Sequence, residues 1–169
     1  MKRRIKHVTV LGSGIMGSGI AAHFANIGVE VLLLDIVPFE LTEAEQKKGL
    51  TKEDKAVRNR IATESLAKLV KASPALLYKK EFAERISVGN FDDDLQKIKN
   101  TDWIIEVVVE RLDIKKSVYE KIEQFRKPGT LVSSNTSGIP INMLVAGRSD
   151  DFKKYFAGTH FFIPVRYLP

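Results

Sequence analysis

The sequence predicts an α/β fold with a doubly wound, mostly parallel sheet and a helical hairpin inserted after the second strand. Short apolar runs alternate with helical patterns along the 169 residues, which is typical of βαβ units. The first apolar run ends at a glycine-rich turn, G-x-G-x-x-G at residues 12–17, with a helical pattern directly behind it. A strand, this turn and a helix in that order indicate a fold of the Rossmann type.

Six strands are predicted from the apolar runs, namely Val8–Leu11, Val31–Leu34, Ile86–Val88, Trp103–Val109, Leu131–Ser133 and Phe156–His160. The run Trp103–Val109 is nearly all apolar, as expected of a parallel strand that is buried on both faces. Asp113 precedes a helical pattern over Ile114–Phe125, and Lys127-Pro128-Gly129 ends it. Right-handed crossovers between successive strands then predict the strand order 3-2-1-4-5-6.

The long connection between the second and third strands, about residues 38–84, predicts the inserted helical hairpin. A helix is expected over Ala56–Val70, and Ser73-Pro74 separates it from a second helix. The segment is basic, with Lys47, Lys48, Lys52, Lys55, Arg58, Arg60, Lys68 and Lys71. Two interpretations stay open: a solvated helix face with pairs such as Glu64 and Lys68, or one wall of a site for an anionic ligand.

The glycine-rich turn predicts a binding site for NAD. Gly12 lets the chain turn sharply out of the strand, Gly14 lets the backbone approach a pyrophosphate, and Gly17 lets the helix pack closely. The helix N-terminus presents unpaired N–H groups to the phosphates. Asp35, at the end of the second strand, can bind the adenosine ribose and repels a 2′-phosphate, which favours NAD over NADP. The cofactor-binding residues predicted here are Gly12, Ser13, Gly14, Ile15, Met16, Gly17 and Asp35, with a purely structural glycine turn as the alternative.

Polar and titratable residues follow three further strands, at the edge where the sites of Rossmann-type folds open. His160 lies at the end of the sixth strand; its imidazole suits the removal of an alcohol proton, while a structural histidine is the alternative. The Ser-Ser-Asn-Thr-Ser run at 133–137 can cap a helix or orient a substrate carbonyl. Glu110 can be a surface acid or can reach the nicotinamide ribose. His7 and His23 are predicted to be structural.

Composition limits the functions that the chain can have. A hydrophobic fraction of 44% supports a proper core, and the absence of cysteine excludes disulfides and thiolate chemistry. The net charge of +6 fits a phosphate-bearing ligand as well as a solvated surface, and without a zinc-finger or RNA-binding motif we expect no nucleic acid partner and no metal. The basic start leads into a strand rather than a signal peptide, and no apolar stretch is long enough to span a membrane, so we expect a cytoplasmic protein.

Four motifs together resemble the NAD-binding domain of the L-3-hydroxyacyl-CoA dehydrogenases of fatty acid β-oxidation. They are GSGIMGSGIA at 12–21, VVVERLDIKK at 107–116, SSNTSGI at 133–139 and GTHFFIPVRYLP at 158–169, in the family's order and spacing. The insertion, with GLTKEDKAVRNRI at 49–61, is most similar to bacterial multifunctional proteins that combine dehydrogenase and enoyl-CoA hydratase modules. The resemblance implies oxidation of (S)-3-hydroxyacyl-CoA to 3-oxoacyl-CoA with reduction of NAD⁺.

The resemblance also implies roles for particular residues. His160 would be the catalytic base of a His–Glu pair, and Ser137 and Asn135 would hold the substrate oxygen or the nicotinamide. Glu110 and Lys115 would contact the cofactor's ribose and nearby groups. The basic insertion would lie where the family receives the phosphates of coenzyme A.

The chain departs from the family at two positions. Ile163 replaces the asparagine of the family's His-Phe-Phe-Asn-Pro and cannot supply its amide hydrogen bonds, and Arg111 replaces another asparagine. In the family, the glutamate that pairs with the histidine and the helical domain that closes over the substrate and dimerises come later in the sequence. Residues 1–169 are therefore expected to be the NAD-binding domain alone, inactive by itself, from a homodimer or a multifunctional assembly. A non-catalytic NAD-binding protein and a related NAD-dependent hydroxyacid dehydrogenase are the alternatives.

Overall fold

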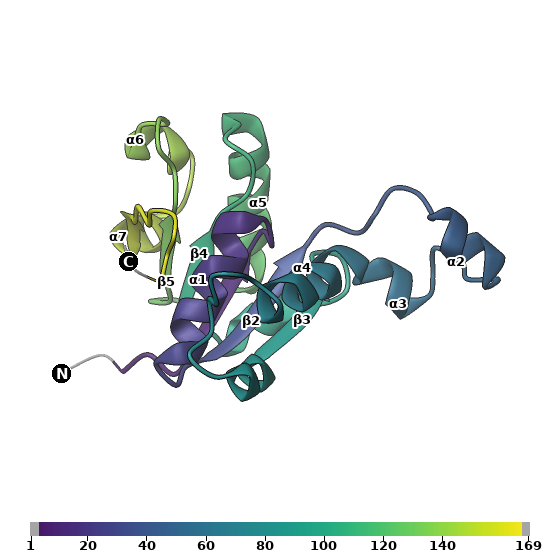
Figure 1. Cartoon of the computed structure of the whole chain (residues 1–169). Helices are drawn as coiled ribbons and strands as arrows, with labels where there is room; N and C mark the ends of the chain where they lie inside the picture. Colours follow the sequence, from purple (N-terminus) through teal and green to yellow (C-terminus); the bar gives the residue numbers. More distant parts are fainter. Residues whose placement is uncertain (1–3, 167–169) are drawn as a thin grey trace.

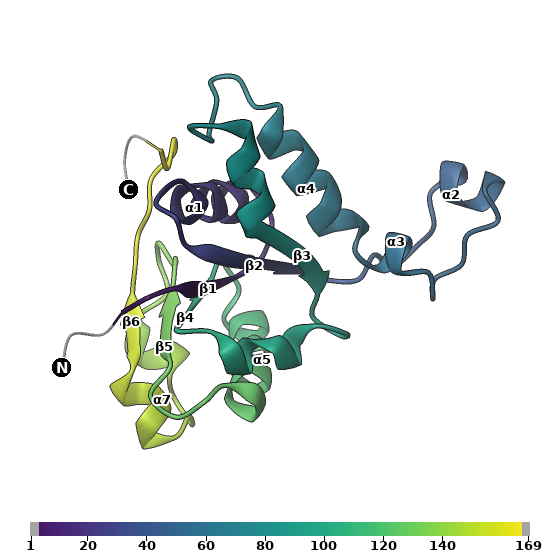
Figure 2. The ribbon, with the colours of Figure 1, turned by 90° about the horizontal axis from the view of Figure 1, so that it is seen from below.

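A six-stranded sheet forms the centre of the fold (Figure 1, Figure 2). The computed structural model describes residues 4–166. The strands are β1 (His7–Leu11), β2 (Glu30–Asp35), β3 (Ile86–Asn90), β4 (Trp103–Glu106), β5 (Leu131–Ser134) and β6 (Phe156–Gly158). Their order is β3-β2-β1-β4-β5-β6, and each of the five pairings is parallel. This confirms the doubly wound fold and the strand order predicted from the sequence.

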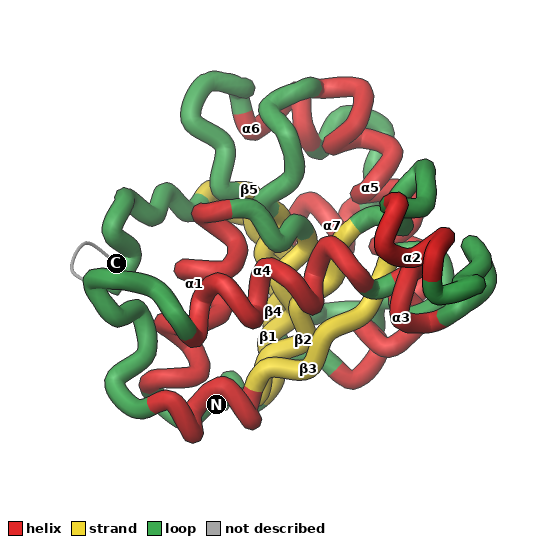
Figure 3. Tube along the Cα trace, turned by 45° about the vertical axis from the view of Figure 1, so that its right-hand side comes forward, coloured by secondary structure: helices red, strands yellow, loops and turns green. Residues whose placement is uncertain are grey.

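Helices cover both faces of the sheet, as Figure 3 shows. On one face, α1 (Ile15–Asn26) and α4 (Arg60–Val70) share a core with Val10 and Ile105. On the other, α5 (Leu112–Phe125) and α7 (Asp150–Lys154) share a second core with Leu11 and Ile104. Neighbouring residues of one strand enter different cores because successive side chains point to opposite faces. The remaining helical elements are α2 (Glu43–Lys47), α3 (Lys55–Arg58), η1 (Lys80–Arg85), η2 (Leu95–Asn100) and α6 (Ile141–Leu144).

The connection between β2 and β3 has two parts with different surroundings. Helix α4 packs against α1 and β3, and its Leu69 belongs to the core. Residues 38–58, which include α2 and α3, extend away from the sheet (Figure 1, Figure 2), and we call this segment the arm. No residue of α2 is buried. At the base of the arm, Arg58 Nε lies 2.6 Å from Asp93 Oδ2, which ties the arm to the loop after β3.

The elements that lead to the site begin or end at slightly different residues than the sequence predicts. Strand β4 ends at Glu106 rather than at residue 109, because the Glu106 carboxylate accepts the Val108 N–H at 2.8 Å and the chain turns out of the sheet. Helix α5 includes Asp113 in its first turn, where a negative charge suits the helix dipole. Strand β6 ends two residues before His160, which therefore lies in a loop.

Among residues 4–166, no helix combines the length and apolar character that a membrane crossing requires. Within the same range, no three side chains of the His, Asp or Glu type are grouped so that they could hold a metal ion. The basic start at residues 1–3 and the last three residues of the motif at 158–169 lie outside the described part.

Candidate cofactor and catalytic site

The glycine loop between β1 and α1 is shaped by close backbone contacts. Gly12 has φ of 104°, a conformation that favours glycine, and a Cβ there would lie 2.7 Å from the Val107 carbonyl oxygen. A Cβ on Gly17 would lie 1.8 Å from the Gly12 oxygen, so only glycine lets α1 start this close to the strand. Gly14 has open space where a Cβ would stand. The loop is therefore closed on the protein side and open at Gly14, which fits a pyrophosphate that approaches the backbone.

Asp35 lies at the end of β2 and faces the glycine loop. Its Oδ2 accepts hydrogen bonds from both the N–H and the hydroxyl of Ser13, each at 2.6 Å, and its Oδ1 accepts the Ile36 N–H at 2.7 Å. The Ser13 hydroxyl also lies 3.2 Å from the Ser65 hydroxyl of α4. These contacts hold the carboxylate in one orientation beside the glycine loop.

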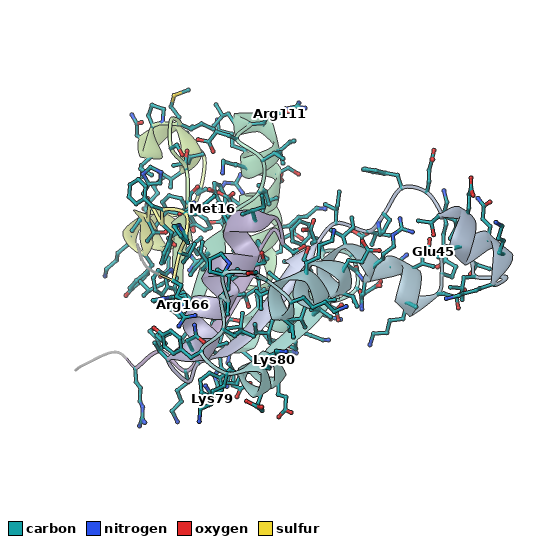
Figure 4. The ribbon with its side chains drawn as sticks, in the orientation of Figure 1. Met16, Glu45, Lys79, Lys80, Arg111 and Arg166 are labelled. Atoms are coloured by element: carbon teal, nitrogen blue, oxygen red, sulfur yellow. The ribbon has the colours of Figure 1, made fainter. Side chains whose placement is uncertain are left out.

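A cleft of about 640 Å³ runs along this edge of the sheet. Its lining includes Gly12, Gly14, Asp35, Phe39, Val107 and Ile114. Ile15, in the first turn of α1, is 77% exposed. Figure 4 shows Met16 at the same end of α1 and Glu45 on the arm, away from this end of the helix. The cleft, the open Gly14 and the fixed Asp35 carboxylate fit the adenosine and pyrophosphate parts of a dinucleotide.

Ser137 and His160 come together at the same edge of the sheet, after β5 and β6. The Ser137 hydroxyl lies 3.3 Å from His160 Nε2. Both residues are exposed and line a second pocket of about 410 Å³, together with Thr136, Gly138 and Ile141. A hydroxyl paired with an imidazole in an open pocket can hold an oxygen and accept its proton.

Glu110 supports the loop that carries Ser137. Its Oε1 accepts the Thr136 hydroxyl at 2.5 Å and the N–H groups of Ser137 and Gly138, each at 3.0 Å. Burial alone raises the pKa of this carboxyl, but the hydrogen bonds from Thr136, Gly138, Ser137 and Lys115 outweigh burial and lower the pKa to about 2. Glu110 is therefore a permanent carboxylate at neutral pH.

The amide of Asn135 links the end of β5 to the segment that carries His160. Its Oδ1 accepts the Phe161 N–H at 2.8 Å. Its backbone N–H donates to the Glu106 carbonyl at 2.9 Å. The amide oxygen is thus occupied by a hydrogen bond within the protein. The side chain is half-buried and does not line the pocket that Ser137 and His160 share.

Lys115 does not reach the surface of the cleft. Its side chain is 1% exposed, and Nζ lies 2.7 Å from Glu106 Oε1 and 3.3 Å from Glu110 Oε2. The structure therefore brings Lys115 to Glu110 and leaves it no direct access to a ligand. Sequence reasoning missed Glu106, although a single acid within the apolar run Trp103–Val109 was a signal for it.

The fold, the glycine loop and Asp35 define a dinucleotide-binding domain of the Rossmann class. Sequence comparison is more specific: residues 7–169 match the family described as 3-hydroxyacyl-CoA dehydrogenase, NAD binding domain, and the chain belongs to this family. The family match confirms both the resemblance and the NAD cofactor that the sequence predicted.

Individual relatives agree with the family. The chain is 55% identical over 168 residues to a probable 3-hydroxyacyl-CoA dehydrogenase of Bacillus subtilis, covering 99% of the chain and 21% of that protein. It is 43% identical to a probable 3-hydroxyacyl-CoA dehydrogenase of Deinococcus radiodurans, covering 98% of the chain and 44% of that protein. The chain thus spans less than half the length of these two relatives.

Solved structures of similar fold point the same way. A 3-hydroxybutyryl-CoA dehydrogenase from Escherichia coli superimposes with a TM-score of 0.72 at 26% identity, covering 96% of this chain and 31% of that one. An (S)-3-hydroxybutyryl-CoA dehydrogenase from Ralstonia eutropha gives 0.67 at 31% identity, covering 96% of this chain and 51% of that one.

Proposed function

We propose that this NAD-binding domain serves the oxidation of (S)-3-hydroxyacyl-CoA to 3-oxoacyl-CoA, with His160 as the base. The observation that carries the proposal is the pair of Ser137 and His160, 3.3 Å apart, at the sheet edge that also holds the glycine loop. Catalysis of alcohol oxidation needs a proton acceptor beside the cofactor cleft, and His160 supplies it.

The role proposed for each site residue follows from its hydrogen bonds and ion pairs. The glycine loop and Asp35 would hold NAD⁺, which would supply the hydride acceptor for the substrate carbon. His160 accepts the proton of the 3-hydroxyl group, and the Ser137 hydroxyl orients the imidazole and the substrate oxygen. The Glu110 carboxylate accepts the Ser137 N–H, and the Asn135 side-chain oxygen accepts the Phe161 N–H, so both side chains fix the backbone beside the catalytic pair. Lys115 acts on the cofactor indirectly, by fixing the Glu110 carboxylate, rather than by touching the ribose.

The basic insertion is proposed as the wall that receives the phosphates of coenzyme A. A cavity of about 330 Å³ lies between the glycine loop and α4, and Ser13, Ser65 and Lys68 contribute to its lining. Lys68 is exposed, so its ammonium group is available to an anion. A positive, partly enclosed surface attracts phosphate groups through long-range electrostatics.

Residues 1–169, with the insertion at about 38–84, are proposed as one domain of a larger enzyme. Relatives in Rickettsia felis and Rickettsia prowazekii carry the name putative fatty acid oxidation complex trifunctional enzyme, and the chain covers 21% of each. These names support a multifunctional assembly, and a homodimer is the second possibility. Cytoplasmic location stays a prediction from the sequence.

Calorimetric titration of the chain with NAD⁺ and NADP⁺ tests the cofactor site. We expect saturable NAD⁺ binding in the micromolar range and NADP⁺ binding weaker by at least ~10-fold, because Asp35 repels the 2′-phosphate. Asp35→Asn should reduce the difference between the affinities for NAD⁺ and NADP⁺. Absence of saturable NAD⁺ binding by the folded chain contradicts the proposal.

A domain exchange tests the catalytic role. This chain replaces the matching part of the Bacillus subtilis relative, and turnover of 3-hydroxybutyryl-CoA is compared with that of free 3-hydroxybutyrate. We expect preference for the CoA ester, and a loss of roughly 10²–10⁴-fold in kcat for His160→Gln at unchanged NAD⁺ affinity. No turnover by a folded, NAD⁺-binding chimera would favour a non-catalytic NAD-binding protein. Preference for the free acid would favour a related hydroxyacid dehydrogenase.

A further inference from the structure

A cluster of buried polar side chains is connected to the Ser137 loop through Glu110. It consists of Glu106 on β4, Lys115 and Tyr119 on α5, and Ser134 on β5. The side chains of Glu106 and Lys115 are 0% and 1% exposed. Removing two charges from water is costly, and an apolar pair of similar volume would often stabilise the fold as well or better. Stability alone therefore does not explain the cluster.

Every oxygen of Glu106 has its full set of donors. Oε1 accepts the Val108 N–H at 2.8 Å and Lys115 Nζ at 2.7 Å. Oε2 accepts the Tyr119 hydroxyl at 2.5 Å and the Ser134 hydroxyl at 2.6 Å. Burial, followed by the charge of Glu106, raises the pKa of Tyr119, so the phenol stays a donor. Such a saturated carboxylate has one orientation.

Two routes lead from Glu106 to the catalytic pair. Through side chains, Lys115 joins Glu106 to Glu110, which holds the Ser137 N–H. Through the backbone, the Glu106 carbonyl accepts the Asn135 N–H at 2.9 Å, and the Ser134 carbonyl accepts the Thr159 N–H at 2.9 Å. The first route ends at Ser137, and the second ends one residue before His160.

We propose that Glu106 is a positioning residue for Ser137, acting through Lys115 and Glu110, and that it affects His160 through the Ser137 hydroxyl. This inference rests on the proposed function, because it assigns Glu106 a part in the catalytic geometry. Glu106 contacts neither pocket and so is no catalytic residue. Its effect is to fix the loop at 136–138 relative to β4 before any ligand arrives, which lowers the cost of ordering the site on binding.

Four variants separate positioning from stability. Glu106→Gln removes the charge that orients Lys115, and Tyr119→Phe removes one donor at nearly constant volume. The double variant Glu106→Gln/Lys115→Met removes both buried charges, so that it keeps a folded domain if the single variant unfolds. Glu120→Gln, an exposed acid on the same helix, is the matched control.

The first measurement needs no cofactor. The amide signals of Ser137 and Gly138 in ¹⁵N–¹H spectra report their hydrogen bonds to Glu110 directly. We expect shifted signals and at least ~10-fold faster exchange of these two amides in the Glu106 variants, smaller changes in Tyr119→Phe, and wild-type values in Glu120→Gln. Wild-type signals at Ser137 and Gly138 in the folded double variant would overturn the inference.

The second measurement compares two ligands. ADP probes the glycine loop and Asp35, whereas NAD⁺ also carries the nicotinamide half, which the proposed function brings beside the loop at 136–138. We expect Glu106→Gln/Lys115→Met to weaken NAD⁺ binding several-fold and to leave ADP binding unchanged. An equal loss for both ligands would contradict positioning. If wild-type protein binds no NAD⁺ while the amides still respond as expected, the proposed function fails and the positioning of the loop stands.

Discussion

The carboxyl edge of the sheet and the arm both carry charged side chains, but these side chains are buried at the sheet edge and exposed in the arm. At the sheet edge, Glu106 and Lys115 are withdrawn from water and satisfied by fixed partners. In the arm, α2 buries no residue, and the lysines remain in solvent. Buried and satisfied charges hold one geometry, whereas exposed charges can change without altering the fold. The charges of Glu106 and Lys115 are thus fixed in position, whereas the lysines of the arm lie in solvent.

The largest effect on stability is expected in the glycine loop, where a Cβ on Gly17 would overlap the backbone. Gly17→Ala places a Cβ 1.8 Å from the Gly12 oxygen, so the backbone must shift. We expect a loss of roughly 3 kcal/mol in the free energy of unfolding, measured in urea, and loss of NAD⁺ binding. Gly14→Ala is the matched control, since nothing lies within 4 Å of its Cβ. It should weaken NAD⁺ binding while the unfolding free energy stays near the wild-type value; equal stability of the two variants would refute this account.

The dependence of stability on pH gives the next largest contrast. The pKa of Glu110 falls from 4.5 to about 2 on folding, so its hydrogen bonds stabilise the protein above about pH 4.5, and this contribution is lost as the pH decreases toward 2. We expect Glu110→Gln to flatten the decrease of the unfolding free energy over this range. Glu45→Gln in the arm should flatten it less, although the Thr42 N–H lowers the pKa of Glu45. Urea unfolding at several pH values measures both profiles; a flatter profile for Glu45→Gln than for Glu110→Gln would contradict this expectation.

At the sheet edge, the positions of residues were predictable where they depend on local spacing or on strand order. Gly12 and Asp35 follow from the spacing of the motif, and the meeting of Ser137 with His160 follows because parallel strands end at one edge. The burial of Lys115 could not be predicted, because its partner Glu106 comes from another element. A lysine in a helical pattern indicates solvent unless that partner is known.

The division of the insertion was equally hidden from the sequence. The apolar residues of the predicted helix over 56–70 indicate a buried face, but not which neighbour covers it. In the structure, Leu69 packs in the core between α4 and α1, while Val57 is buried at the base of the arm. Only the tertiary contact decides where packing stops and the arm begins.

A smaller effect is expected at the base of the arm. Arg58 donates two hydrogen bonds to Asp93, from Nε at 2.6 Å and from Nη2 at 2.9 Å. Arg58→Ala removes this tie, so amide exchange over residues 43–58 should become faster, while exchange in β1 and β4 stays as in the wild type. Hydrogen exchange followed by mass spectrometry measures both regions at once. Arg4→Ala, an exposed arginine remote from the arm in sequence, is the control. Faster exchange throughout the sheet would show that the arm is part of the cooperative fold.

The smallest effect on stability is expected from the exposed lysines of the arm. Lys47, Lys48 and Lys52 make no ion pair among the described residues, and all three are exposed. Their triple replacement by Gln should change the free energy of unfolding by less than ~0.5 kcal/mol, because hydrated side chains contribute little to the fold. The same replacement should weaken binding of coenzyme A if the arm attracts its phosphates, and the loss should shrink as salt screens the charges. Titration of coenzyme A at two ionic strengths, beside urea unfolding, distinguishes the cases. Large destabilisation would mean that the arm, like the sheet edge, depends on the position of its charges and not only on their presence.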